Sequence, residues 1–139
     1  MSSHWKTKSD ENLDATNNLI GSGLYSSSVH CAYYSCFQLM YHILSSHFMW
    51  DDHKINQDST AGGRENNQGL HVWLINTIFK ELSAGNSFDA NNFQKAIIGL
   101  KKTRTKADYK NMIIMDNVAN NVQLEAIETL RLLRKNFRI

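Results

Sequence analysis

Apolar side chains recur at three- and four-residue intervals along most of the chain, a spacing typical of amphipathic helices. The expected helices run from about His4 to Ile20, from Leu24 to about His47, from Leu70 to Leu82, from near Ser87 or Asp89 onward, and from near Asp116 to the end of the chain. Between the second and third helices, residues 51–69 contain only Ile55 and Ala61 as apolar side chains. A segment this polar has little to bury, so we expect a long polar loop there.

The second helix has the widest apolar face, covering roughly 200° of its circumference at 100° per residue. A face this wide predicts a central helix with neighbours on more than one side. The remaining stripe is polar but small, and consists of Cys31, Ser35, Gln38, His42 and Ser45. Two interpretations remain open: a strip that faces solvent, or a surface that lets another helix or a second subunit approach closely.

Composition agrees with an all-α fold. The chain has 139 residues, no proline and only 7 glycines, whereas sandwiches and barrels need many turns rich in both. We predict an up-and-down helical bundle of four main helices plus an N-terminal helix, forming a single domain over residues 1–139.

The charge and the cysteines say little about partners. The formal net charge is +2, too small by itself to indicate nucleic-acid binding. Cys31 and Cys36 point about 140° apart on a helix, so no disulfide is expected between them. The N-terminal residues are polar, and the most apolar window, 37–50, is too short and too interrupted to span a bilayer. We expect a cytoplasmic protein without a membrane segment.

Arg104 is the most informative polar residue, because it lies within about 40° of the centre of the fourth helix's apolar stripe, near Leu100. A buried guanidinium without a partner is unfavourable by several kcal/mol. Asp108, four residues later, is within reach on the same helix. The pair could be structural and close one end of the bundle, or it could mark a polar site at a helix or subunit interface. The Arg104 side chain could also extend outward to solvent.

A basic run surrounds this arginine and consists of Lys101, Lys102, Lys106 and Lys110. It is interpreted either as a solvated helix flank or as a patch that contacts phosphate. Tyr109 is the only aromatic neighbour in the run, which disfavours sequence-specific RNA recognition by base stacking.

Two motifs resemble those of a known family. AYYSCF at 32–37 lies inside the second helix, and LKKTRTKADY at 100–109 lies on the fourth. Together they resemble the HEPN superfamily of small helical bundles, and in particular a prokaryotic branch with an A-Y-Y-A-x-F helix and a later L-x-x-x-R-x-x-A-D-Y helix. The resemblance covers nearly the whole chain. The residues that carry the first motif are Ala32, Tyr33, Tyr34 and Phe37, which we expect in the core.

The resemblance implies a homodimer and a site at Arg104. Many HEPN members are metal-independent RNases whose site is an arginine followed, four to six residues later, by a histidine. Here Tyr109, Lys110 and Asn111 occupy that window, and a tyrosine with a pKa near 10 is a poor general base at neutral pH.

We therefore expect a non-catalytic HEPN-like module that binds nucleotide or nucleic-acid phosphate near Arg104, with Asp108, Tyr109 and Lys106 as further candidate binding residues. The alternatives are a divergent RNase of toxin type, or a bundle that only binds a partner protein, such as a nucleotidyltransferase. No cofactor is expected.

The histidines do not predict a metal site. His42 and His47 are five residues apart and diverge by about 140° on a helix, although His53, Asp51 and Asp52 follow closely. Metal ions need several ligands that converge on one point, so we expect surface histidines at a helix end.

Overall fold

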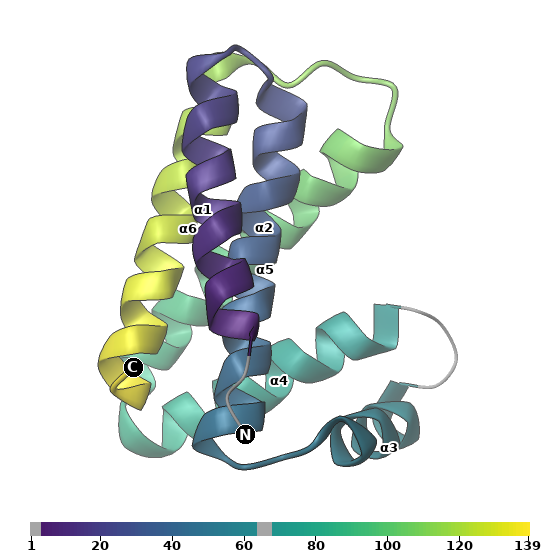
Figure 1. The fold of residues 1–139 in the computed structure, drawn as a ribbon, viewed down its shortest axis with the longest axis vertical. Helices are drawn as coiled ribbons and strands as arrows, with labels where there is room; N and C mark the ends of the chain where they lie inside the picture. Colours follow the sequence, from purple (N-terminus) through teal and green to yellow (C-terminus); the bar gives the residue numbers. More distant parts are fainter. Residues whose placement is uncertain (1–3, 64–67) are drawn as a thin grey trace.

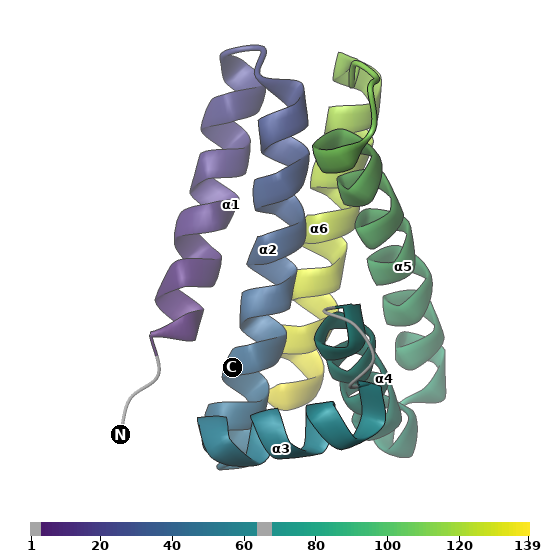
Figure 2. The same cartoon turned by 90° about the vertical axis from the view of Figure 1, so that its right-hand side faces the viewer.

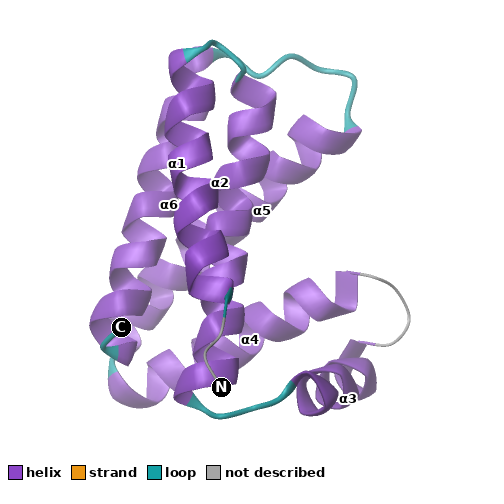
Figure 3. Ribbon diagram, viewed as in Figure 1, coloured by secondary structure: helices purple, strands orange, loops and turns teal. Residues whose placement is uncertain are grey.

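A computed structural model describes residues 4–63 and 68–139. Its helices are α1 (Trp5–Gly21), α2 (Tyr25–His42), α3 (Asp52–Gly63), α4 (Gln68–Gly85), α5 (Ser87–Tyr109) and α6 (Asp116–Phe137), which are labelled in Figure 1. A π-helical turn, η1 (Ile43–His47), continues α2 without a break. In these two ranges the chain contains helices and loops and no strand (Figure 3). The all-α fold class is confirmed.

The helices α1, α2, α5 and α6 run lengthwise beside one another, and α3 and α4 lie at one end of them (Figures 1 and 2). The central helix is α2, which contacts α1, α4, α5 and α6. Helices of the same chain therefore cover the wide apolar face of α2. The side chains that it buries are Ser28, Val29, Ala32, Tyr33, Ser35, Cys36, Phe37, Leu39, Met40 and Tyr41.

The polar stripe of α2 is the surface on which α1 packs. Ser35 is fully buried, and its carbonyl oxygen accepts a hydrogen bond of 2.6 Å from the Ser9 hydroxyl of α1. The Asn12 amide of α1 donates to the Gln38 side-chain oxygen at 2.7 Å. Small side chains let the two backbones approach, and hydrogen bonds satisfy the polar groups that the contact buries. The interpretation as a solvent-facing strip is therefore wrong, and the neighbour is a helix of the same chain.

The predicted polar loop over residues 51–69 is wrong for most of its length, because α3 occupies 52–63 and α4 begins at Gln68. Residues 64–67 of the predicted loop lie outside the described residues. The carboxylate of Asp51 accepts a hydrogen bond of 2.8 Å from the Lys54 backbone N–H, which caps the start of α3. Ile55 is fully buried against the core. One N-terminal cap and one buried apolar side chain are enough to hold α3 in a helix, because α4 supplies the surface on which α3 packs.

The start of α5 is fixed by polar contacts that differ from the predicted cap. Asn86, rather than Ser87 or Asp89, caps the helix, and its side-chain oxygen accepts from the Asp89 N–H at 3.0 Å. The Asp89 carboxylate instead accepts from Lys135 Nζ at 2.9 Å and Asn136 Nδ2 at 3.0 Å, both on α6. These hydrogen bonds, from Asn136 and then Lys135, lower the pKa of Asp89. They attach the start of α5 to the end of α6.

Candidate functional site

The guanidinium of Arg104 lies between α5 and α2 and is held by three side chains. Its Nε atom is 2.9 Å from a carboxylate oxygen of Asp108, an ion pair whose N–H is not aligned as a hydrogen bond. Its Nη2 atom donates to the hydroxyl of Tyr34 at 2.9 Å and to that of Tyr109 at 3.4 Å. The side chains of Arg104 and Asp108 are only 14% and 20% exposed. The Arg–Asp contact expected from the sequence is therefore present.

Three tyrosine rings surround the same charge. The Cζ atom of Arg104 lies 5.7 Å from the ring centre of Tyr33, 5.1 Å from that of Tyr34 and 5.3 Å from that of Tyr109. A cation over an aromatic face is attracted by the ring's negative face, more strongly where water is excluded. The AYY motif of α2 thus forms the wall against which the arginine of α5 packs.

Asp108 has a second partner that the sequence motifs do not indicate. Its Oδ2 atom lies 2.8 Å from Nδ1 of His30, one turn before Tyr34 on α2. The ring of His30 lies 4.7 Å from that of Tyr34, measured between centres. Asp108 therefore connects α5 to α2 through His30, whereas its contact with Arg104 lies within α5.

His71, near the start of α4, is the other histidine at this site. Its ring stacks on Phe37 with centres 4.4 Å apart, and its Nδ1 atom lies 2.7 Å from the Tyr33 hydroxyl. Burial, together with the positive charges of Arg104 and Lys101, lowers the pKa of His71 to about 4. Burial also raises the pKa of Tyr33. At neutral pH both groups are uncharged, and we assign the shared proton to the phenol, which donates to the ring nitrogen.

The structure brings together most of the predicted site residues. Arg104, Asp108 and Tyr109 meet the motif residues Tyr33 and Tyr34 in one cluster. Ala32, Tyr33 and Phe37 are buried in the core, as expected. Tyr34 is only partly buried and packs at the edge of the core, and Lys106 lines a neighbouring groove. The sequence motifs do not indicate His30 or His71, because the family's histidine follows the arginine on the same helix, whereas these two come from α2 and α4. The i, i+4 spacing of His30 and Tyr34 is the one local signal for the first of them.

A groove of about 560 Å³ lies between α4 and α5, which diverge from their connection near Asn86 (Figure 1). Its apolar part is formed by Val72 and Ile75 of α4 and by Ile98 of α5. Four lysines also line it: Lys101, Lys102, Lys106 and Lys110. Within the described part of the chain, no carboxylate lines the groove and none of these lysines forms an ion pair. The groove therefore presents uncompensated positive charge beside an apolar surface.

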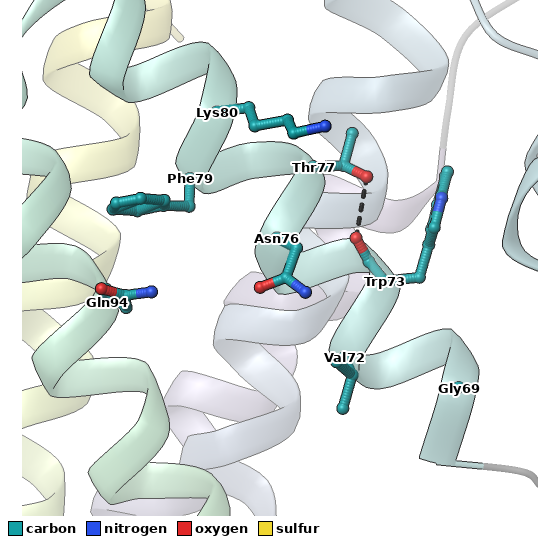
Figure 4. A pocket seen from close by; sticks show the side chains of 8 residues that line it. All are labelled: Gly69, Val72, Trp73, Asn76, Thr77, Phe79, Lys80 and Gln94. Carbon is teal, nitrogen blue, oxygen red and sulfur yellow. Dashed lines mark hydrogen bonds between the residues drawn. The ribbon is translucent and has the colours of Figure 1, made fainter. Parts of the chain in front are cut away.

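A second hollow, of about 550 Å³, adjoins this groove along α4 and shares Val72 and Asn76 with it (Figure 4). Two aromatic residues line the hollow, but Figure 4 shows that Trp73 and Phe79 point to opposite sides of the helix. The ring of Trp73 also lies 6.0 Å from that of Trp50, measured between centres. The two aromatic rings of the hollow therefore do not form a common stacking surface.

Over residues 4–63 and 68–139, no group of three or more His, Cys, Asp or Glu side chains is arranged to hold a metal ion. No helix in those ranges is long and apolar enough to cross a membrane.

Comparison with family models, with curated proteins and with solved structures finds no match for this chain. The resemblance to the HEPN superfamily therefore stays a prediction that rests on its two motifs.

Proposed function

We propose that this chain is a non-catalytic, HEPN-like binding module that takes an anionic ligand in the groove between α4 and α5, beside Arg104. The observation that carries the proposal is the set of four groove-lining lysines without a carboxylate partner among the described residues. Like charges gathered in a cleft raise the local concentration of ligands of opposite charge. The anion is either the phosphate of a nucleotide or nucleic acid, as the motifs led us to expect, or a carboxylate of an acidic protein segment.

In this proposal Arg104 has an indirect role. Its guanidinium is already engaged by Asp108, Tyr34 and Tyr109, so the direct contacts to the anion come from Lys106 and the other groove lysines. Arg104 adds positive charge behind the groove and holds α5 against α2. Asp108 and Tyr109 fix the position of the guanidinium.

The test is a salt titration of binding with two fluorescent polyanions of matched charge, an oligouridylate and an oligoglutamate. Either probe should bind, and Lys102→Ala/Lys106→Ala should weaken that binding and reduce the salt slope for the oligouridylate by about 1.4. Lys95→Ala is the matched control, because Lys95 is an exposed α5 lysine that does not line the groove. If neither probe binds, or if the control weakens binding as much, the proposal is wrong.

The alternative of a divergent RNase is favoured by one observation. His71 is uncharged at neutral pH and accepts a hydrogen bond from Tyr33, whose ring borders Arg104, so an imidazole lies near the arginine although the usual window lacks a histidine. If this alternative holds, the purified protein should cleave single-stranded RNA in the presence of a chelator, and His71→Gln should abolish the cleavage. Cleavage that survives this substitution would come from another source.

A further inference from the structure

The lining of the α4–α5 groove narrows the class of ligand. We propose that its occupant is an acidic amphipathic helix of a partner protein, whose apolar face lies on Val72, Ile75 and Ile98 and whose carboxylates meet the groove lysines. The inference rests on the proposed function, because it names the ligand of that same groove.

The apolar part of the groove is the first argument. Val72 is 45% exposed and Ile98 is 51% exposed, on two helices that diverge, while Ile75 is buried beneath them. Burying aliphatic side chains against apolar groups is favourable, whereas a phosphate offers no apolar surface to bury them against. A groove between two helices with such a lining is the surface on which an amphipathic helix docks through residues at i, i+3, i+4 and i+7.

The arrangement of the lysines is the second argument. Lys102 and Lys106 are one turn apart on α5, a rise of about 6 Å, and Lys110 follows the last turn. Carboxylates spaced four residues apart on a partner helix repeat at the same interval. The carboxylates of the partner helix can therefore pair with the lysines turn by turn. This pairing selects an acidic helix and also fixes its position along the groove.

The aromatic residues argue against nucleic acid. Binding of a single strand without sequence preference relies on aromatic rings on which the bases stack. Among the described residues that line the groove none is aromatic, and Trp73 and Phe79 of the adjoining hollow point to opposite sides of α4 (Figure 4). A nucleic acid would contact the lysines and leave Val72 and Ile98 without apolar partners.

The experiment uses designed helical peptides of about 18 residues, or five turns. Each carries leucines on one face and glutamates on both flanks, with a cross-link on the outer face that keeps it helical, and the set covers several leucine registers. A peptide of the same composition in scrambled order is the control. Fluorescence anisotropy with the full chain should show that at least one register binds with a Kd below about 100 µM and the scrambled peptide at least about tenfold more weakly.

Substitutions on the protein separate this inference from the proposed function. Ile98→Gln should weaken peptide binding by about fivefold to tenfold, and Lys102→Ala/Lys106→Ala by about tenfold or more. Leu124→Gln, at an exposed apolar position of α6 outside the groove, should leave binding unchanged. Circular dichroism of each variant checks that it is folded.

Each result decides between the two proposals. If no register binds better than the scrambled peptide, or if Ile98→Gln has no effect, the inference is wrong. If the oligouridylate then still binds in a lysine-dependent manner, the proposed function stands and its ligand is nucleic acid. If no peptide and no polyanion binds, both proposals fail.

Discussion

The hydroxyl oxygen of Tyr33, in the middle of the central helix α2, lies 2.7 Å from Nδ1 of His71 at the start of α4. Tyr33 is fully buried, and a buried phenol needs a hydrogen-bond partner. His71 supplies that partner, and its ring also stacks on that of Phe37. The contact attaches the first half of α4, and with it one wall of the lysine-lined groove, to the centre of the bundle.

This contact predicts a dependence of stability on pH. The pKa of His71 is lowered from its ordinary value of 6.5 to about 4 in the folded chain. The unfolded chain therefore binds this proton more readily, so stability should fall as the pH drops from 6.5 to about 4. Thermal melts over this range should show a steeper decline for the natural chain than for Tyr33→Phe/His71→Phe, which keeps the ring stack. Equal slopes would show that His71 does not contribute.

Replacing Arg104 tests whether the Arg104–Asp108 pair is structural. Arg104→Met keeps much of the packing of the side chain. It leaves His30 as the remaining partner of Asp108, and it removes the contacts of the guanidinium with three tyrosine rings. We expect a loss of about 2–3 kcal/mol in the free energy of unfolding, less than for a fully buried pair. Arg131→Met is the matched control, because Arg131 forms an exposed ion pair with Glu128, and it should change stability little. Denaturant melts that show equal effects would contradict the structural role.

Phe37 should be a major contributor to stability. It is 8% exposed and contacts the rings of Tyr33, Tyr34, Tyr41 and His71. Phe37→Ala removes this packing and leaves a cavity, so the free energy of unfolding should fall by about 3–5 kcal/mol. Urea denaturation measures this loss in the free energy of unfolding. A loss below about 1 kcal/mol would mean that the Phe37 side chain is not buried as described.

Gly99 offers a stabilising substitution. It lies in the interior of α5, and a Cβ atom there would meet only the end of the Glu125 side chain, at 2.9 Å. That flexible, partly exposed end can move aside, while alanine restricts the unfolded chain and favours the helix. Gly99→Ala should therefore raise the free energy of unfolding by about 0.5–1 kcal/mol. A decrease in the urea midpoint would show that moving the Glu125 side chain aside costs more free energy than the alanine gains.

Self-association is a separate prediction. The wide face of α2 no longer supports a dimer, because helices of the same chain cover it. Exposed apolar side chains remain at the end of α5 and on the connection to α6, namely Tyr109, Met112, Ile113 and Met115. We still expect the homodimer that the HEPN resemblance implies, with this connection in the interface. Sedimentation at tens of micromolar should give twice the mass of 15.9 kDa, and Ile113→Lys should shift it to that of one chain. A monomer under these conditions would contradict the prediction.

The local pattern of apolar residues was sufficient to locate most of the helices. The apolar spacing placed α1, α2, α4, α5 and α6 within a few residues of where they lie, because each has its own periodic stripe. It missed α3, whose sequence is polar around the single buried residue Ile55 and whose packing surface comes from α4. Intrinsic pattern cannot reveal a helix whose partner surface is formed by another segment.

The chain's sequence by itself determined the all-α class and the Arg104–Asp108 contact, because both depend on spacing within one helix. Only the tertiary structure decided which residues complete the cluster: His30 and Tyr34 from α2, and His71 from α4 against Tyr33. It also decided that the lysines of α5 face the apolar side of α4 across a groove. The contacts of the cluster join residues 38 to 78 positions apart. Both they and the groove arise from how whole helices pack, which no local repeat in the sequence encodes.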